Sequence, residues 1–386
     1  MIEKALFDLM QYIDKQNLCG YDPYDALNSR LLNILSFNVR ELKIVYTQGL
    51  KRMPWNIRKI IGIKAGINPK GMGILASAYL RLFLIKKEDS FLDKVIYCLN
   101  WLKDNYSNGY SGYCWGYNFD WQSRGFFLSQ GTPTIVNTAY ISNAFLDAYD
   151  FYNDREFLDI ARSSCNFIIK DLNKTNDDNE SICFSYTPTD QAQVYNASLL
   201  GACLLARVYS YTGEHELLDI ANSAINFVIT HQNADGSWYY GNTSFQKWID
   251  GYHTGFILES LYDFIKFSGR SDLSNPLNHG LEFYKKNLFT EEKIPKFRSD
   301  KLYPIDIHCC ASAIITFSKL RDIQSENLHL ANEIAKLTIQ NMQDDKGYFY
   351  FQKYRLFINK IPYMRWSQVW MLNALSILLL SEPRHE

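Results

Sequence analysis

Five polar residues recur at a nearly constant interval along the 386-residue chain, and each stands near the start of a helical segment. They are Asn137, Asn196, His253, His308 and Arg365, separated by 59, 57, 55 and 57 residues. An apolar stretch with helical spacing follows each of them. A repeat of this length is typical of an array of helical pairs. We therefore expect these side chains to converge at one end of a ring of helices, where they would form a site.

Carboxylates accompany the two histidines of this series. Asp250 precedes His253 by three residues, and Asp306 precedes His308 by two. Glycoside hydrolysis needs two carboxyl groups, one acid and one base or nucleophile, on either side of the scissile bond. We assign Asp250 and Asp306 to those roles and expect the histidines to orient substrate or to shift the pKa of the acid. Helix capping is the structural alternative for both aspartates.

A uronate reaction is the other chemistry that these residues could perform. Elimination or epimerisation needs a cation for the carboxylate, a base for the proton and an acid for the leaving group. Tyr252 or His253 would then be the base and Arg365 would bind the carboxylate. The predicted substrate-binding residues are Asp120, Arg124, Asn137, Tyr195, Asn196, Trp248, Tyr252, Arg365 and Trp366. Helix capping, ion pairing and core packing are their structural alternatives.

The elements that would position these residues are pairs of helices. First helices are expected to begin near Gly71, Thr134, Gln193, Asp250, Asp306 and Arg365, and second helices follow five of them. The helix predicted from Ile2 to Asp14 would complete the sixth pair. The pattern predicts an all-α fold, an (α/α)6 toroid with short β connectors, whose ring the N-terminal helix closes.

One part of the chain does not fit the repeat. We treat residues 1–386 as one domain and residues 21–70 as a helical insertion that covers one face of the ring. The insertion carries a basic cluster between Lys51 and Lys59. Its charges are few and interrupted, which is more typical of a solvated surface than of a binding patch.

Tandem helical hairpins with Gly-aromatic connectors resemble the six-hairpin glycosidase-like superfamily. Four blocks, GYDPYDALNS, INPKGMGILASAYL, YHTGFILESL and YPIDIHCCASAI, resemble proteins from polysaccharide-biosynthesis clusters, of the vibrio polysaccharide biosynthesis protein J type. This narrower resemblance spans the whole chain. It implies a role around exopolysaccharide or surface glycan, and it brings no catalytic residues with it.

Two other toroid families share short motifs with the chain. The segment QNADGSW at 232–238 is similar to a repeat of squalene cyclases and prenyltransferase β subunits, but the acidic DxDD motif of the cyclases is absent. His308-Cys309 resembles part of the zinc site of lanthionine cyclases, but no matching Cys-Gly motif follows in a neighbouring repeat. Zinc needs several convergent nitrogen or sulfur ligands. We predict no metal and no cofactor.

Composition narrows the compartment and the partners. A net charge of −1 gives no electrostatic reason to expect nucleic acid. Eight cysteines without a CxxC motif suit reduced thiols, and no apolar run is long enough for membrane insertion. We therefore expect a cytoplasmic protein.

The leading functional hypothesis is a carbohydrate-active enzyme of surface or exopolysaccharide biosynthesis. It would be glycoside hydrolase-like and would act on an oligosaccharide or activated glycan in the toroid cleft, with polysaccharide-assembly proteins as partners. The alternatives are a uronate lyase or C5-epimerase, a non-catalytic glycan-binding or scaffold protein, and an isoprenoid or terpene cyclase-like protein. Fold alone cannot decide among them, because toroids host both enzymes and non-enzymes.

Overall fold

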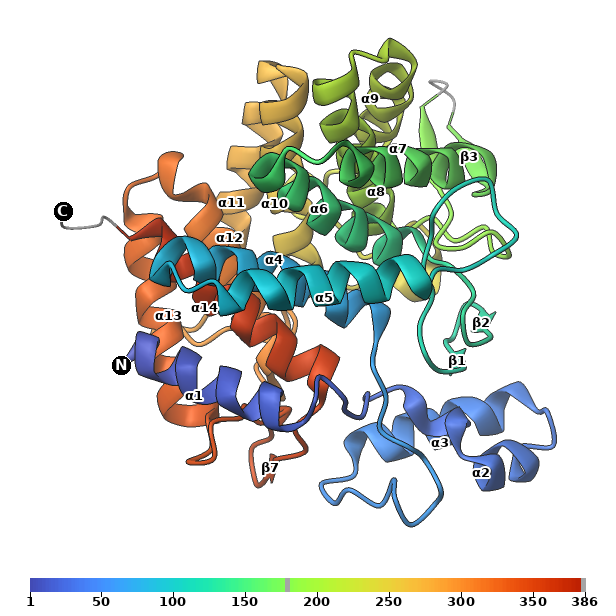
Figure 1. The fold of residues 1–386 in the computed structure, drawn as a ribbon, viewed down its shortest axis with the longest axis vertical. Coiled ribbons are helices and arrows are strands. Elements are labelled where there is room, and N and C mark those ends of the chain that lie inside the picture. The colour runs from blue at the N-terminus through green and yellow to red at the C-terminus, as the bar shows by residue number, and fades with distance from the viewer. Residues whose placement is uncertain (178–180, 383–386) are drawn as a thin grey trace.

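A computed structural model describes residues 1–177 and 181–382 and has an inner ring of helices within an outer one (Figure 1). The inner helices are α4 (Pro69–Lys86), α6 (Ile135–Tyr152), α8 (Tyr195–Thr212), α10 (Gly251–Ser268), α12 (Ile307–Lys319) and α14 (Trp370–Ser381). Each contacts the next, and α14 contacts α4, so the ring is closed. The outer helices are α5 (Ser90–Asp104), α7 (Arg155–Lys170), α9 (His215–Thr230), α11 (Ser274–Asn287), α13 (Glu326–Met342) and α1 (Ile2–Lys15).

The helix α1 closes the array as predicted from the sequence. It packs against both α13 and α14, so the N-terminal helix supplies the outer partner of the last inner helix. Its apolar side chains are buried at one face: Ile2, Ala5, Leu6, Leu9 and Ile13. The all-α (α/α)6 toroid is thereby confirmed.

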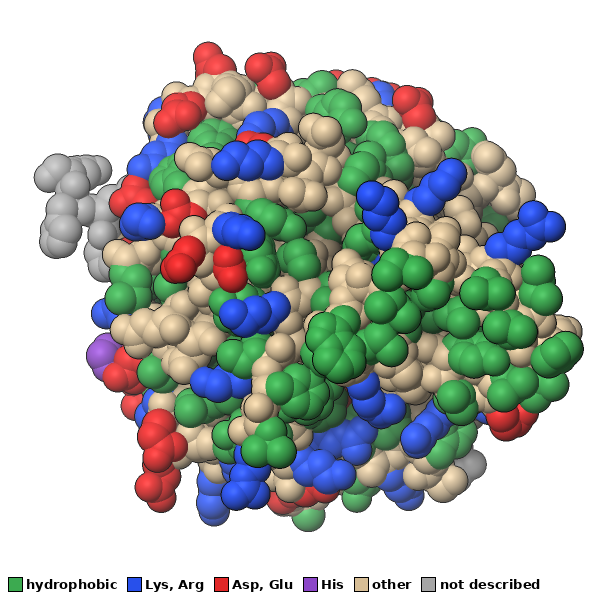
Figure 2. Space-filling view, turned by 90° about the horizontal axis from the view of Figure 1, so that it is seen from below, with side chains coloured by type: hydrophobic (Ala, Val, Ile, Leu, Met, Phe, Trp, Pro, Cys, Tyr) green, Lys and Arg blue, Asp and Glu red, His purple; other side chains and the backbone are tan. Residues whose placement is uncertain are grey.

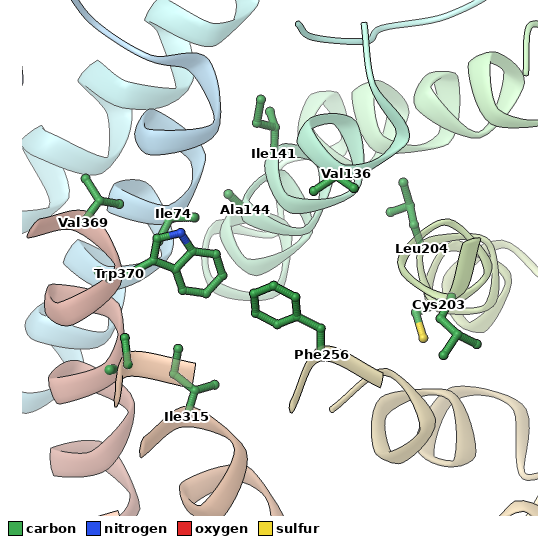
Figure 3. Close-up of a cluster of buried hydrophobic side chains, with 14 of the residues drawn as sticks. Ile74, Val136, Ile141, Ala144, Cys203, Leu204, Phe256, Ile315, Val369 and Trp370 are labelled. Atoms are coloured by element: carbon green, nitrogen blue, oxygen red, sulfur yellow. The ribbon is translucent and has the colours of Figure 1, made fainter. Parts of the chain in front are cut away.

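The inner helices pack closely because small residues face their neighbours. A Cβ atom added at Gly73 of α4 would lie 3.0 Å from the Ile141 Cα of α6. In the centre of the ring, Phe256 of α10 and Trp370 of α14 point toward one another, with ring centroids 5.3 Å apart (Figure 3). Cavities lie toward each end of the inner ring, and Phe256 lines both of them.

Short strands form where an outer helix leads to the next inner helix. Antiparallel pairs join β1 (Trp121–Gln122) to β2 (Phe127–Leu128) and β3 (Lys174–Asn176) to β4 (Ile182–Phe184). A three-stranded sheet has β6 (Gln352–Lys353) between β5 (Ile305–Asp306) and β7 (Ile358–Asn359). The 3₁₀ turn η2 (Ser244–Gln246) precedes α10, and a π-helical turn, η5 (Met364–Val369), leads into α14. Two further 3₁₀ turns are η3 (Ser271–Leu273) and η4 (Leu320–Asp322).

The segment between α1 and α4 packs beside the ends where the inner helices begin (Figure 1). It contains η1 (Asp25–Asn28), α2 (Arg30–Leu35) and α3 (Arg40–Arg52). A buried ion pair joins it to the ring, with the Arg365 guanidinium donating to both oxygens of Asp22 at 2.6 and 2.9 Å. The predicted solvated surface is wrong for Arg58, which is fully buried and pairs with Asp25 at 2.7 Å.

Candidate functional site

A cavity of about 530 Å³ opens where the inner helices begin. Five of the six inner helical segments contribute a polar residue from their first turn to its wall. These residues are Lys70, Asn196, His253, His308 and Arg365. The second cavity, of about 560 Å³, lies toward the other end of the ring, where acidic and basic side chains pair with each other, as Arg207 does with Asp147. The first cavity is the better candidate because its polar groups are less fully engaged.

Lys70 belongs to the ring of polar residues, and the sequence analysis missed it. It is the second residue of α4, the position that Asn196 holds in α8 and His308 in α12. Its Nζ atom lies 4.4 Å from the ring centroid of Tyr140 and 5.2 Å from that of Trp370. Burial, and then the charge of Arg365, lower the pKa of Lys70 well below its ordinary value. The shared helix position was the signal that could have revealed it.

Asp250 and His253 form a dyad at the start of α10. The His253 backbone N–H donates to Asp250 Oδ1 at 2.9 Å, and the ring Nδ1–H donates to Oδ2 at 2.7 Å. Trp248 Nε1 also donates to Oδ2, at 3.0 Å. Burial opposes ionisation of Asp250, but His253 and these hydrogen bonds hold its pKa below the usual value. The carboxylate therefore caps the helix and also fixes the orientation of the imidazole.

His308 differs from His253 in its electrostatic surroundings. Burial, and then the charge of Lys70, lower the pKa of His308 well below its ordinary value, so the ring is neutral. Its Nδ1 lies 3.2 Å from the backbone carbonyl of Trp366. A carbonyl only accepts, so Nδ1 carries the proton and Nε2 keeps a lone pair. In the described chain, the Nε2 atoms of both His253 and His308 have no hydrogen-bond partner.

The structure gives Asp306 a different place from Asp250. Asp306 is fully buried, caps α12 by accepting from the His308 backbone N–H at 2.8 Å, and also accepts from Trp366 Nε1 and Gln352 Nε2. It is absent from the cavity wall, where Asp250 is the single carboxylate among the described residues. The hypothesis that these two aspartates flank a glycosidic bond is therefore not supported by the geometry, because one of them cannot reach a ligand in the cavity.

Tyr252 lies between the two imidazoles. Its ring centroid is 4.1 Å from that of His253 and 5.0 Å from that of His308. Burial, and then the charge of Asp250, raise the pKa of Tyr252 well above its ordinary value. The phenol therefore stays protonated, which suits a hydrogen-bond donor and argues against the predicted role as a base.

Aromatic rings cover much of the remaining wall. Trp248 stacks on Tyr240 with centroids 4.6 Å apart and planes at 13°. Trp366 packs 4.4 Å from His308. Faces of this kind bind the apolar side of sugar rings while their polar edges bind hydroxyl groups. The predicted residues Trp248 and Trp366 are both part of the cavity wall.

Three predicted substrate-binding residues lie outside the cavity wall. Asp120 accepts from the Gln130 backbone N–H at 2.7 Å and so stabilises the turn beyond β1 and β2. Tyr195 is buried, and its hydroxyl faces Asn242 at 3.4 Å. Asn137 is completely buried, and its side-chain amide atoms have no hydrogen-bond partner in the described chain. The proposed capping role is also wrong for Asn137, since Thr134 caps α6.

Positive charge dominates the cavity. Arg365, which was predicted to bind a carboxylate, is already neutralised by Asp22. Five further cations line the wall and have no ion pair among the residues described: Lys51, Arg52, Arg124, Lys247 and Arg298. The positive ends of the inner helices point the same way. An anionic ligand is therefore favoured electrostatically.

Within the described chain, no three His, Cys, Asp or Glu side chains are grouped as a metal site would require. The same part of the chain contains no helix that is both long and apolar enough to cross a bilayer.

Neither a protein-family model nor a curated protein sequence matches the chain. Several solved structures do resemble it. A sugar epimerase from a ruminal bacterium is 12% identical with a TM-score of 0.62, covering 83% of this chain and 90% of its own. The GH76 alpha-mannanase of Bacteroides thetaiotaomicron is 14% identical with a TM-score of 0.61, over 82% of this chain and 87% of its own. The unsaturated glucuronyl hydrolase of Bacillus sp. GL1 is 10% identical with a TM-score of 0.63, over 97% and 96%.

Identities this low show a shared fold and nothing finer. The chain thus shares the (α/α)6 toroid fold of these solved structures, while the resemblances to the six-hairpin glycosidase-like superfamily and to the vibrio polysaccharide biosynthesis protein J type stay predictions.

Proposed function

We propose that this protein is a carbohydrate-active enzyme that moves a proton at a carbon of an anionic saccharide, as an epimerase or a uronate lyase does. The observation that carries this proposal is the pair of imidazoles in one cavity wall with opposite settings. His253 is bonded to the Asp250 carboxylate, and His308 is held neutral. A carbon acid needs one group that accepts a proton and another that donates one.

The roles of the two histidines follow from their hydrogen bonds. His308 Nε2 has the lone pair that can remove a proton from a carbon next to a carbonyl or carboxylate group. His253, whose Nδ1–H is bonded to Asp250, would act as the acid and return a proton from its Nε2. In epimerisation the proton is returned to the opposite face of that carbon, and in elimination it goes to the leaving oxygen. Lys70, which lines the same cavity, would donate a hydrogen bond to the negative oxygen that forms in between.

An anionic saccharide fits the charges of the wall. Five unpaired cations line the cavity, and its single carboxylate among the described residues is already bonded to His253. The stacked pair Tyr240 and Trp248 supplies a face for the sugar ring. Because Arg365 is paired with Asp22, we assign carboxylate or phosphate binding to the unpaired cations.

The wider context rests on the sequence resemblance and on the neighbours. Among the structural neighbours are sugar epimerases and glucuronyl hydrolases, which supports a saccharide substrate. We propose that the enzyme works in the cytoplasm, in surface or exopolysaccharide biosynthesis, with polysaccharide-assembly proteins as partners.

Proton exchange with solvent tests the proposal whichever product the enzyme forms. The protein would be incubated in D2O with uronates, N-acetylhexosamines, reducing oligosaccharides and nucleotide sugars, and each sugar would be examined by NMR and mass spectrometry. We expect deuterium at one carbon of an anionic sugar, and loss of this exchange in H308Q. Release of a monosaccharide without carbon-bound deuterium would instead indicate hydrolysis, and saturable binding without either change would indicate a glycan-binding protein.

A further inference from the structure

The segment between α1 and α4 exposes an unusual amount of apolar surface. Of 18 large hydrophobic side chains exposed in the described chain, eight lie within 30 consecutive residues. They are Leu31, Ile34, Leu35, Phe37, Val39, Val45, Trp55 and Ile60. Phe37, Trp55 and Ile60 are 75%, 73% and 84% exposed, and no residue of α2 is buried. We call these eight side chains the apolar patch. A cluster of this kind marks an interaction surface.

The apolar patch is held in a fixed shape and is not a loosely packed region. Arg58 is buried and pairs with Asp25, and Ser29 Oγ donates to the Ile61 carbonyl at 2.6 Å. Ala26, Leu50 and Ile63 form a small core beneath it. The segment therefore buries its own core and still presents its remaining apolar side chains outward.

The charge of the same segment identifies the partner. Residues 30–64 contain eight Lys or Arg and one acidic residue, Glu41, although the whole chain has a net charge of −1. Several of these cations are exposed: Arg30, Arg40, Arg52, Lys59 and Lys64. Apolar side chains among basic ones are the combination that binds the surface of an anionic bilayer. A second copy of the chain docking patch to patch would bring the two sets of cations together, which disfavours that partner.

We propose that residues 30–64 dock this protein on an anionic membrane surface. The apolar patch enters the interfacial region of the lipid and the surrounding Lys and Arg side chains contact the headgroups. This binding lies in the plane of the interface and needs no helix that crosses the bilayer.

Docking would also orient the cavity. Helix α3 supplies Gln48, Lys51 and Arg52 to the cavity wall while Val45 of the same helix is part of the apolar patch. Figure 2, seen from below, shows hydrophobic side chains gathered over the region of α2 and α3, with Lys and Arg side chains on the same face. The mouth therefore lies close to the lipid surface, where a saccharide attached to a lipid would be within reach.

Vesicle sedimentation tests this inference without any enzymatic assay. The whole protein is mixed with vesicles of phosphatidylcholine alone or with about 30% phosphatidylglycerol, at low and high salt. We expect the protein to bind the anionic vesicles at least about tenfold more tightly than the neutral ones. Binding to the anionic vesicles should weaken as the salt concentration rises. The variant F37S/W55S/I60S and the variant R30Q/K59Q/K64Q should each bind at least about tenfold more weakly.

A matched control changes two exposed apolar residues on the outer helix α5, as I96S/Y97S, and should bind like the unchanged protein. Comparing the unchanged protein on the two kinds of vesicle gives an answer even where a variant fails to fold. Equal sedimentation with and without anionic lipid would overturn the inference. So would self-association, measured by analytical ultracentrifugation, that F37S/W55S/I60S abolishes without any vesicle binding. The proposed enzymatic function would survive either result, since the D2O exchange assay contains no lipid.

Discussion

The capping aspartates Asp250 and Asp306 offer a matched pair of substitutions that separates proton transfer by histidine from two-carboxylate hydrolysis. Each carboxylate accepts from the backbone N–H of a following histidine and from a tryptophan Nε1. Only Asp250 also bonds a histidine ring, at 2.7 Å. Asparagine at either position keeps one oxygen for the cap and places an amide NH2 where the second oxygen was.

The expected losses follow from these contacts. D250N removes the charge-assisted hydrogen bond to the His253 ring, which is worth about 1.5–3 kcal/mol. If that energy supports the imidazolium in the transition state, turnover falls about 10- to 150-fold. D306N removes a hydrogen bond from Gln352 instead and leaves both histidine rings in place. Both variants should lose about 1.5–3 kcal/mol of unfolding free energy, because each loses one hydrogen bond that a buried carboxyl group accepts near a helix start.

The assay is deuterium exchange into the active sugar, with urea unfolding as the measure of stability. We expect D250N to be slow and D306N to retain at least about a third of the original rate, a change below 1 kcal/mol. Equal and severe losses in both variants would restore the two-carboxylate hypothesis. Unchanged exchange in D250N would refute the role of the Asp250–His253 dyad.

Three further substitutions test single contacts. Burial raises the pKa of Glu259 in the second cavity to about 7 from an ordinary 4.5. The protonated side chain therefore stabilises the folded protein, and this stabilisation is complete below about pH 4.5 and is lost as the pH rises through 7. E259Q should remove this dependence. Between pH 4.5 and pH 8 the unchanged protein should therefore lose about 3 kcal/mol more unfolding free energy than E259Q does, measured by urea unfolding, and parallel pH profiles would contradict this. D22N leaves the buried Arg365 without its carboxylate and should cost about 3–5 kcal/mol of unfolding free energy, measured in urea. The control D8N, in the exposed pair with Lys4, should cost less than about 0.5 kcal/mol. Similar losses in the two variants would refute the anchoring role of the Asp22–Arg365 pair. K70M removes a buried amine and should lower exchange at least about tenfold while stability stays the same or rises, whereas full activity would remove Lys70 from the site.

The ring could be predicted from the sequence because each helical pair buries apolar side chains in the toroid. The helical spacing of apolar residues therefore recurs in every pair. The N-terminal helix could be placed for a related reason: an inner helix without an outer partner leaves apolar surface exposed. The strand connectors were also visible, since Gly and aromatic residues recur between the pairs. These features depend on local residue patterns and on the number of helices, and a single sequence contains both kinds of information.

The site was predictable only in part. Asn196, His253, His308 and Arg365 of the repeated series do lie in the cavity wall, whereas Asn137 of the same series is buried outside it. Lys70 holds the same position, but the non-repeating segment before it obscured the register. Asp306 was assigned to the cleft although it is buried, because sequence shows that a residue starts a helix and not which way its side chain turns. The pairing of Arg365 with Asp22 links positions 343 residues apart, which no local pattern reveals.

Carbon-bound deuterium tests the central claim most directly. An anionic sugar incubated with the protein in D2O should acquire deuterium at a single carbon, and the exchange should fall by at least about a hundredfold in H308Q, the range usual for loss of a general base. The contradicting result would be a sugar that is cleaved or bound with no deuterium on carbon, or an H308Q variant that exchanges as fast as the unchanged protein.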